Sequence, residues 1–582
     1  MFKLDSDKIG IIVSVVSIFI FFTLIFFALN EYIWCDEAYT LELISNSYHE
    51  VIFITAEDVH PPFYYLLLKS IFSILIFLKI NYSEVIIGKI VSILPIVLLL
   101  IFNFTVIRKK FGYLSAGLFS LLLIGMPKMI LYGFQLRMYS WSLLFLILTF
   151  YYAYEITRKP KPKTKTWIYL ILFSLLGAYT NYFTLINIVV IYILLFAFII
   201  RYRRKTDPNF SVLDYLRKNK QKKGEKFSLF DYIFKTKIKI NKYKMKKLII
   251  SIVAIILLYL PWLFILSSKS QTTASSSQTS NLFQFLPNAI SYKISSQGGL
   301  SFDFVPKVIM FIFSPDFHRT AGDFSIFGVI LFIAILVLII YSIFRNNEYE
   351  NKFIYLGPLV LLGTILLAFI ASSHNFSERY VFTSLGVFWL SISLLLSKNF
   401  DKKSLFVPIF IIILIISSIT IYGFIEQQKE HSIVYNDVNE ILNEIGPNDL
   451  VVSTNSHIYV EFSYYLKNNH ILYDFNYPEF DSSNYTYSEA IKFLTGWTAP
   501  PKSDDPDFLY NKQYILEKIE KTLQKNGKVW ILTNNTRDEV YTKLISKINE
   551  KNIKITEKTI QYEKYPDESR PYPKKVIIIS SV

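Results

Sequence analysis

The chain has 582 residues, of which 52% are hydrophobic and 17% aromatic, and its mean hydropathy is +0.37. An ordinary soluble domain cannot bury so large an apolar fraction, so the composition excludes that class and predicts a polytopic membrane protein. The formal net charge is +16, and residues 201–247 alone hold 17 Lys and Arg against four acidic residues, a net +13. This pattern is typical of a cytoplasmic loop that can touch anionic lipid, and a nucleic-acid role is the weaker interpretation.

Apolar segments of roughly spanning length recur through the first 424 residues and predict about 11 to 13 transmembrane helices. The segments are 11–29, 85–107, 113–127, 139–156, 167–180, 183–200, 248–267, 324–344, 353–372, 379–397 and 405–424, with 61–80 as a further candidate. The first segment is longer than the apolar core of a secretory signal and no small-residue cleavage site follows it. We therefore expect it to be a retained helix.

Basic loops predict the orientation of the chain, because cytoplasmic loops carry the excess of Lys and Arg. This rule places the N-terminus and the loop 201–247 inside. Three shorter basic stretches are expected on the same side, at Arg108–Lys110, Arg158–Lys165 and Lys398–Lys403. The protein is thus expected to be a multi-pass protein of the plasma membrane with a cytoplasmic N-terminus.

The alternation of spans also decides what lies outside. If 11–29 crosses outward and the next span crosses inward, 61–80 cannot cross fully, and its embedded Lys69 suits a helix lying at the membrane surface. The first outer loop is then 30–84 and a later one is 268–323. The residues after 424 are expected on the same extracytoplasmic face.

Two acidic clusters follow the first predicted span on its outer side. Asp36 and Glu37 come first, and Asp58 and His60 follow about twenty residues later. Ionised groups next to hydrocarbon are costly unless they act on something polar, so these residues are the leading candidates for chemistry. Cys35 is the only cysteine, cannot form an internal disulfide, and is best explained as a neighbour of the acidic pair.

The same topology gathers other polar residues on this outer face. They are Asp36, Glu37, Asp58, His60, Gln135, Arg137, Asn181, His374, Glu378 and Arg379. One cavity at the membrane surface has room for all of them in this topology, although the topology alone does not show that they meet.

Four motifs together resemble one enzyme group. They are Asp36-Glu37, Asp58-Val59-His60-Pro61-Pro62-Phe63-Tyr64-Tyr65, Leu136-Arg137-Met138-Tyr139-Ser140 and Glu378-Arg379-Tyr380. Over residues 1–400 this combination resembles the protein O-mannosyltransferase and aminoarabinose-transferase group of glycosyltransferases, which have the C-type (GT-C) fold.

The resemblance implies a membrane enzyme that moves a sugar from a polyprenyl-phosphate carrier, dolichyl or undecaprenyl phosphate, with inversion at the anomeric carbon. The acceptor would be a hydroxyl of a protein, a lipid or a cell-surface glycan at the outer face, and the activity would be that of a mannosyltransferase-like hexosyltransferase. The chemistry agrees with the motifs, because a hydroxyl acceptor benefits from a carboxylate base and a phosphate leaving group benefits from cationic donors.

By matching positions, the resemblance assigns catalysis to the acidic residues. Asp36 is the expected general base, Glu37 would orient the acceptor or the loop, and Asp58 could share either role. If a divalent cation such as Mg or Mn takes part, Asp36 and Asp58 are its candidate ligands.

The resemblance assigns the donor phosphate to three basic residues, His60, Arg137 and Arg379. Relatives place a lysine where this chain has His60, which makes that contact potentially pH-sensitive. Candidate contacts to the sugar or acceptor are Tyr139, Asn181 and Tyr380, and some relatives carry a histidine at the position of Asn181.

These assignments have structural and functional alternatives. Asp58, together with Glu57, could be a charge pair at the start of the surface helix, and Arg137 and Arg379 could simply extend to the membrane interface. A transporter or flippase for a polyprenyl-linked sugar is the alternative function, although the sequence shows no paired interrupted helices in two halves. A non-catalytic relative that binds the lipid-linked sugar is a third.

No signature of a soluble enzyme competes with the resemblance. The sequence has no Gly-rich phosphate loop after a strand, no metal-spaced His or Cys cluster and no Gly-x-Ser-x-Gly elbow, so use of a nucleotide sugar is disfavoured. The outer stretch 268–300 is rich in Ser, Thr and Gln. It is long enough to cover a cavity, and its composition equally suits a plain connector.

The composition changes at about Phe424, and residues 425–582 predict a small soluble α/β domain. Expected strands are Asp449–Thr454, Lys528–Thr533 and Lys575–Ser580, and expected helices are 511–525 and 537–550. The domain also holds Asn-x-Ser/Thr sequences at Asn484 and Asn534. It could recognise the acceptor or stabilise the enzyme, and its fold class alone does not choose between these roles.

Overall fold

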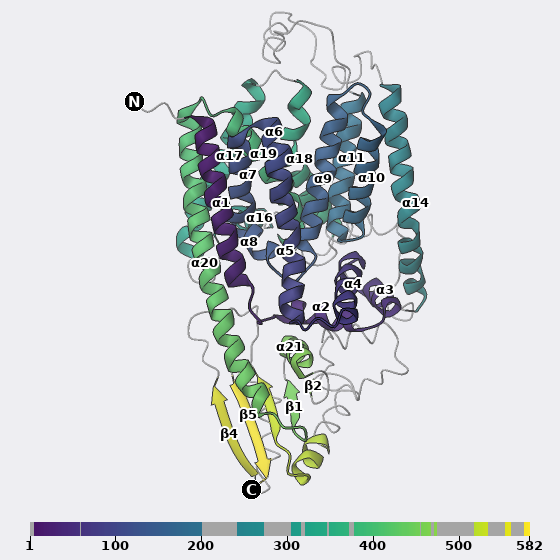
Figure 1. Ribbon diagram of the computed structural model, residues 1–582, viewed down its shortest axis with the longest axis vertical. Coiled ribbons are helices and arrows are strands. Elements are labelled where there is room, and N and C mark those ends of the chain that lie inside the picture. Colours follow the sequence, from purple (N-terminus) through teal and green to yellow (C-terminus); the bar gives the residue numbers. More distant parts are fainter. Residues whose placement is uncertain are drawn as a thin grey trace, which may run out of the picture.

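The computed structural model of the chain is a bundle of long helices with a small domain at one end (Figure 1). It describes residues 5–58, 60–200, 241–272, 304–315, 321–345, 349–371, 378–453, 456–466, 471–473, 517–533, 553–559 and 575–581. Some predictions lie outside these residues: most of the loops 201–247 and 268–300, His374, the helix 537–550, and both Asn-x-Ser/Thr sequences.

Each of the eleven predicted spans coincides with a helix, so the polytopic helical class is confirmed. These helices are α1 (Ser6–Ala28), α5 (Glu84–Phe102), α7 (Tyr113–Gly125), α9 (Tyr139–Arg158), α10 (Thr164–Ala178), α11 (Tyr182–Ile200), α14 (Lys242–Thr272), α17 (Ala321–Arg345), α18 (Gly357–Ala371), α19 (Phe382–Lys398) and α20 (Lys403–Glu444). Six helices of the described residues are long and apolar enough to cross a membrane. A further candidate span is α7 together with α8 (Pro127–Gly133), a pair bent by 66°.

Shorter elements extend or connect these helices. They are η1 (Asn103–Ile107) and α6 (Arg108–Phe111), which continue α5, and α16 (Phe304–Phe313), η2 (Tyr349–Tyr355) and η3 (Glu378–Val381). The π-helical turn η1 places Asn103 toward α7, where its side-chain amide donates to Ala116 O and Ser120 Oγ, both at 2.8 Å. A π-turn of this kind re-aims a side chain without ending the helix.

The centre of the bundle is α19, which is almost completely buried and packs against α7, α9 and α18. At the edge of the bundle, α1 and α7 cross at very close range. A Cβ atom added to Gly10 would lie 2.3 Å from Leu114 N, and one added to Gly117 would lie 2.4 Å from Gly10 O. Only glycine allows two helix backbones to approach this closely, so these two residues fix how α1 docks.

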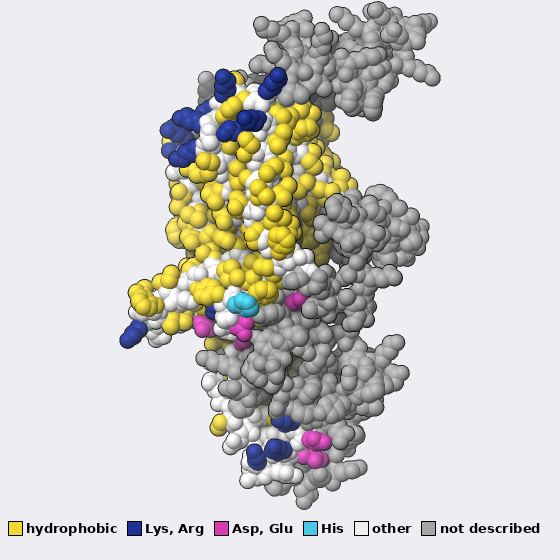
Figure 2. Space-filling model, turned by 90° about the vertical axis from the view of Figure 1, so that its right-hand side faces the viewer, with side chains coloured by type: hydrophobic (Ala, Val, Ile, Leu, Met, Phe, Trp, Pro, Cys, Tyr) yellow, Lys and Arg dark blue, Asp and Glu magenta, His cyan; other side chains and the backbone are white. Residues whose placement is uncertain are grey.

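The outside of the bundle is an apolar belt (Figure 2). Large apolar side chains such as Phe19, Phe26 and Phe264 are more than two-thirds exposed there. The belt is bounded by Lys and Arg at one end and by acidic residues and His at the other (Figure 2). A surface of this kind is stable in contact with lipid, so the chain is a multi-pass membrane protein.

The predicted cytoplasmic stretches meet at the basic end of this belt. The Lys110 Nζ of α6 lies 4.7 Å from the ring centroid of Tyr154 on α9, and the Arg158 guanidinium lies 5.7 Å from the same centroid. The end with α6 is opposite the end with α2 in Figure 1. Basic loops and the acidic motif are therefore separated by the length of the bundle.

At the acidic end, three short helices gather beside the ends of the spans (Figure 1). They are α2 (Cys35–Ser45), α3 (Tyr48–Glu57) and α4 (Phe63–Phe77). α4 has 15 residues, as α10 and α18 do, so its length alone does not test the prediction that 61–80 lies at the membrane surface. Lys69 of α4 donates to Ile44 O at 2.9 Å and ties α4 to the end of α2.

The C-terminal region contains a five-stranded mixed sheet in the order β2-β1-β3-β5-β4. Its strands are β1 (Leu450–Ser453), β2 (Ile471–Tyr473), β3 (Val529–Thr533), β4 (Ile553–Thr559) and β5 (Lys575–Ser581). β1 pairs in parallel with β2 and β3, whereas β5 pairs antiparallel with β3 and β4. The three predicted strands are confirmed as β1, β3 and β5, and residues 517–524 of the predicted helix 511–525 are helical. The sequence missed the two edge strands, which are short or alternate with polar residues.

The two parts of the chain are joined by one continuous helix. The predicted boundary at 424 falls inside α20, which continues without a break to Glu444. Beyond it, α21 (Ser456–Leu466) packs on α2. The Tyr465 hydroxyl donates to Glu31 O at 3.4 Å, and the Tyr464 hydroxyl donates to Glu84 Oε2 at 3.2 Å. The small domain therefore rests on the end of the bundle that carries the acidic motif.

Candidate active site

The site begins with α2, whose first turn carries both acidic residues. Glu37 is only 4% exposed and uses its carboxylate to hold backbone in place. One oxygen accepts from Leu136 N at 2.7 Å and the other from Trp34 N at 3.3 Å. A buried carboxylate with two such donors is well satisfied. Glu37 thus fixes the start of α2 against the loop that follows α8.

That loop, residues 134–138 between α8 and α9, presents Arg137 to α2. Arg137 is 4% exposed, and its Nη1 donates to Asp36 O and to Thr40 Oγ1, both at 3.0 Å. Its guanidinium also lies 5.8 Å from the ring centroid of Tyr39. Because Glu37 binds Leu136 and Arg137 binds the backbone of Asp36, the loop and the first turn of α2 hold each other.

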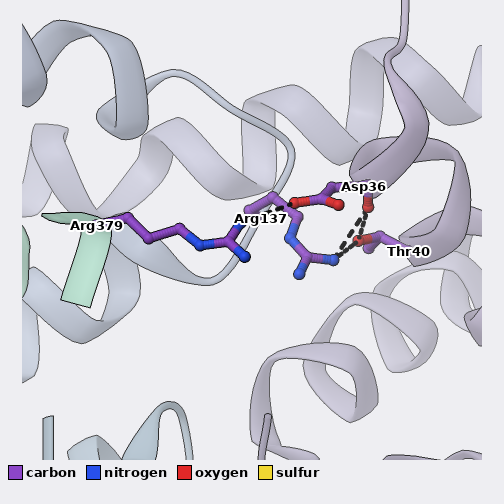
Figure 3. A network of polar contacts seen from close by, with 4 residues as sticks. All are labelled: Asp36, Thr40, Arg137 and Arg379. Atoms are coloured by element: carbon purple, nitrogen blue, oxygen red, sulfur yellow. Dashed lines mark hydrogen bonds and ion pairs between the residues drawn. The ribbon is translucent and has the colours of Figure 1, made fainter. Parts of the chain in front are cut away.

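Asp36 has a different environment from its neighbour. Its side chain is 23% exposed, and Asp36 Oδ2 lies 3.8 Å from Arg379 Nη1, which comes from η3 at the start of α19. Figure 3 shows the side chains of Arg137 and Arg379 converging on the segment that carries Asp36. An ion pair at 3.8 Å is loose, so the Asp36 carboxylate keeps acceptor capacity toward a ligand.

The second acidic motif lies beside the first. The Tyr39 hydroxyl of α2 donates to Asp58 Oδ2 at 2.9 Å, which ties the end of α3 to α2. Asp58 is the C-terminal cap residue of α3 and does not start a helix, so the expectation that it forms a charge pair at a helix N-terminus is wrong. Burial raises the pKa of the Tyr39 hydroxyl well above its usual value, and the negative charge of Asp58 raises it further.

His60 lies near the two arginines. Burial, with the positive charges of Arg137 and Arg379, lowers the pKa of His60 well below its usual value. Each of these causes disfavours a second positive charge. The lowered pKa favours a neutral imidazole at pH 7, which still offers one N–H donor, and the role of His60 at the donor phosphate stays a prediction.

Two nitrogen atoms of this group are shielded from solvent and lack a hydrogen-bond partner among the described residues. They are Arg137 Nε and His60 Nδ1. A buried, unsatisfied donor on a permanent cation costs free energy unless something accepts from it. The arrangement is thus prepared for a ligand with acceptor oxygens.

The three candidate contacts to sugar or acceptor have distinct surroundings. Tyr139 lies among Arg137, Asp36 and Arg379, and its ring packs edge-on against Tyr132 at 5.0 Å. The ring of Tyr380 stacks on Phe183 with centroids 4.0 Å apart. Asn181 is buried, and its side-chain oxygen accepts from Phe183 N at 2.8 Å, which caps the start of α11. Only Tyr139 is brought to the carboxylate and the arginines by these contacts.

Sequence reasoning missed two residues that hold the site together. Thr40 lies one helical turn after Asp36 and accepts from Arg137. Lys89 of α5 is 4% exposed, and its Nζ donates to Asn30 O, Asn30 Oδ1 and Tyr32 O at 2.7, 2.9 and 2.8 Å. A lysine inside an apolar span is a signal of function or of a specific partner, so Lys89 could have been found from the sequence.

Asp36 and Asp58, the candidate ligands of a divalent cation, both have partners within the protein. No group of three His, Cys, Asp or Glu side chains that could hold a metal occurs within the described ranges. Asp36 faces the Arg379 cation and Asp58 accepts from Tyr39. A cation such as Mg²⁺ is often held by one or two carboxylates together with substrate phosphates, so the divalent cation at Asp36 and Asp58 stays a prediction.

Comparisons with known proteins give structural matches only. No protein-family model matches the chain, and no curated protein matches it. In structure the chain is similar to ArnT from Cupriavidus metallidurans bound to undecaprenyl phosphate, with 9% identity, a TM-score of 0.48 and 97% of each chain covered. It is also similar to an oligosaccharyltransferase from Archaeoglobus fulgidus in complex with Zn and sulfate, with 13% identity, a TM-score of 0.42, and 88% of this chain and 68% of that chain covered.

Proposed function

We propose that this protein is a glycosyltransferase that uses a polyprenyl-phosphate-linked sugar as donor. The observation that carries the proposal is the buried cation Arg137, which holds the backbone of Asp36 and keeps an unpartnered Nε beside a partly exposed carboxylate. A site that combines a base with forked cationic donors suits transfer from a phosphate leaving group to a hydroxyl.

In the proposed reaction, Asp36 accepts the proton of the acceptor hydroxyl. The acceptor oxygen forms a bond to the anomeric carbon while the bond from that carbon to the phosphate oxygen breaks, and the polyprenyl phosphate leaves with the electron pair. Attack from the face opposite the phosphate gives inversion. Arg137 and Arg379 stabilise the charge that develops on the phosphate, and neutral His60 is a further donor.

Glu37 has a supporting role in this scheme. Because both of its oxygens accept from backbone N–H groups, it orients the loop of Arg137 rather than the acceptor. This is one of the two roles that the sequence left open for Glu37. Tyr139 is the best placed of the three candidate sugar contacts, since it lies among the charged residues.

The positive-inside rule supports an orientation for the enzyme. With the basic end in the cytoplasm, Asp36, the arginines and the C-terminal domain lie on the extracytoplasmic side of the plasma membrane. The acceptor, a hydroxyl of a protein, lipid or cell-surface glycan, would reach the site from that side. A hexose such as mannose is the sugar class that the sequence motifs favour.

The test uses purified full-length protein with radiolabelled polyprenyl-phosphate hexoses and a total membrane extract as the source of acceptor. We expect release of label from the carrier and its appearance on an acceptor. Asp36→Asn should abolish transfer and leave binding of the carrier lipid intact. Asp401→Asn is the matched control, because Asp401 is exposed at the opposite end of the bundle, and it should transfer normally.

The outcomes separate the proposed enzyme from its alternatives. If the parent protein binds carrier-linked sugar but releases no label with any acceptor fraction, the enzyme proposal fails and a non-catalytic binding protein remains. If sugar-lipid moves between leaflets of proteoliposomes without loss of the sugar, the protein is a flippase.

A further inference from the structure

The surroundings of α4 change part-way along the helix. In its first part, Tyr64, Tyr65 and Leu68 are completely buried and Phe72 is 7% exposed. From Ile74 onward the large apolar side chains are exposed instead. The sequence predicts that 61–80 as a whole lies at the membrane surface, whereas in the structure only the end of this segment is open to another surface.

The first part of α4 is held by direct contacts with the bundle. Phe63 N donates to Tyr179 O at the end of α10 at 3.1 Å, and the Tyr64 hydroxyl shares a hydrogen bond of 2.7 Å with Ser92 Oγ of α5. Two spanning helices therefore fix the start of α4. Its other end is presented in a defined direction, away from these contacts.

Residues 74–80, here called the α4 tip, form an ordered apolar projection. Five large apolar side chains of the tip are 48% to 84% exposed, namely Ile74, Ile76, Phe77, Leu78 and Ile80. Lys79 has a φ of 54°, and Ile80 N donates to Leu75 O at 3.1 Å. A left-handed residue with such a hydrogen bond is a regular way to close a helix, so the tip is not a loose loop.

The tip lies at the level where two spans end. Ser83 caps α5 by accepting from Ile86 N at 3.2 Å, and its hydroxyl donates to Glu31 Oε2, just after α1, at 2.8 Å. Ile80 is three residues before Ser83, so the two lie within about 11 Å of each other. Figure 2 shows hydrophobic side chains that project sideways at the acidic end of the belt. The tip is therefore close to the edge of the hydrocarbon region.

Lipid fits this surface better than a second protein molecule does. A stable protein interface takes about 20–30 residues from each partner, whereas the tip is a segment of seven residues. Burial of one large apolar side chain is favoured by roughly tenfold or more, and the tip exposes five of them. Lys79 is exposed within the tip, and a long basic side chain can keep its ammonium group at lipid phosphates while its neighbours lie in hydrocarbon.

We propose that the α4 tip is a lipid-docking surface. Its apolar side chains enter the edge of the phospholipid leaflet at the acidic end of the bundle, and Lys79 meets the lipid phosphates. The start of α4 follows directly on His60, Pro61 and Pro62. One short helix thus connects the lipid surface with the second acidic motif, and this inference does not depend on the proposed activity.

A spin label at Phe77 tests the lipid contact in the full-length protein. Cys35 is the only cysteine and is 7% exposed, so Phe77→Cys can be labelled selectively with a nitroxide, and the labelled parent measures the background. The protein is placed in liposomes of phosphatidylcholine and phosphatidylglycerol. Collisions of the label with oxygen, which concentrates in hydrocarbon, are compared with collisions with a water-soluble nickel chelate. We expect oxygen to dominate.

Two matched variants calibrate this ratio. Phe19→Cys places the label on α1 within the apolar belt, at a side chain that is 73% exposed. Ile433→Cys places it on α20 at a side chain that is 59% exposed. Because α20 begins at Lys403, Ile433 lies about 45 Å along the helix, beyond about 30 Å of hydrocarbon. The ratio for Phe77→Cys should be close to that of Phe19→Cys, and a ratio equal to that of Ile433→Cys would overturn the proposal.

The same labelled protein separates lipid from a second copy of the chain. If two copies meet at the tip, labels at Phe77→Cys give short distances between molecules, and these disappear when unlabelled protein is added in excess. We expect no such distances, and their presence would overturn the proposal. Ile80→Cys, at the end of the tip, repeats both measurements if Phe77→Cys does not fold. None of the readouts needs turnover, so they hold or fail separately from the proposed function.

Discussion

Two groups of charged residues meet at α2, one around Glu37 (the back face) and one around Asp36 (the front face), and their charges are used in opposite ways. On the back face, Glu37 accepts two backbone hydrogen bonds and Lys89 gives three, so their charges are used within the protein. On the front face, Asp36 has one loose ion pair with Arg379, and Arg137 keeps an unpartnered Nε. Charges whose bonds are complete hold structure, whereas charges with remaining capacity can bind a ligand.

The largest expected effect comes from the front face. Asp36→Asn should lower the rate of sugar transfer by roughly 10²- to 10⁴-fold, the contribution of a general base. The melting temperature should remain close to that of the parent, because Asp36 is partly exposed and its ion pair is long. Transfer assays and thermal melts on the same preparations check both statements. Full activity in Asp36→Asn would show that the front-face carboxylate is not used in transfer, and the functional distinction between the two faces would be lost.

Arg137→Lys should have the next largest effect. Lysine keeps the charge but loses the fork that holds Asp36 O and Thr40 Oγ1 while leaving Nε for a ligand. We expect KM for the donor to rise by about tenfold to a hundredfold, as for the loss of a charge-assisted hydrogen bond. The matched variant is Arg379→Lys, whose side chain is 38% exposed, and its effect should be smaller. Equal effects would show that charge alone, rather than the fork, acts at both positions.

On the back face, Glu37→Gln should act on stability first. The amide group of glutamine offers one oxygen where the carboxylate offered two, so it turns an N–H donor toward Leu136 N or Trp34 N. Leaving one buried donor unsatisfied costs about 1–3 kcal/mol. A lower melting temperature and a matching loss of active protein are expected, while Glu440→Gln, at an exposed position on α20, should change neither. A Glu37→Gln protein of normal stability that is inactive would instead make Glu37 a catalytic residue.

The smallest effect concerns pH. Because the pKa of folded His60 is lowered, the unfolded chain binds a proton more readily, with an ordinary pKa of about 6.5. The stability contributed by neutral His60 is therefore fully present above about pH 6.5 and is lost as the pH falls below it. Melts of the parent and of His60→Gln between pH 5 and pH 8 should differ in slope only at the acidic end. Activity from pH 7 to pH 8 should show no titration of His60, and a His60-dependent step there would contradict the neutral form.

Much of the fold was predictable because its signals are local. An apolar run of spanning length forms a helix wherever it occurs, and all eleven predicted spans are helices. Three of the five strands were found from buried β-branched runs, and the edge strands β2 and β4 were not. The boundary at 424 was set by composition, but composition does not show that α20 continues as one helix to Glu444.

The candidate site, like the fold, could be predicted only in part from the sequence. The sequence by itself predicted that acidic and basic motifs lie near the ends of spans on one side of the bundle, since span length and loop charge indicate where helices end. Only the tertiary structure decided that Glu37 binds Leu136, that Arg137 binds Asp36 O and that Arg379 pairs with Asp36. These pairs are about a hundred or more residues apart, and hydrogen-bond capacity depends on which distant segments pack together. Adjacent carboxylates thus look alike in the sequence and differ in the folded protein.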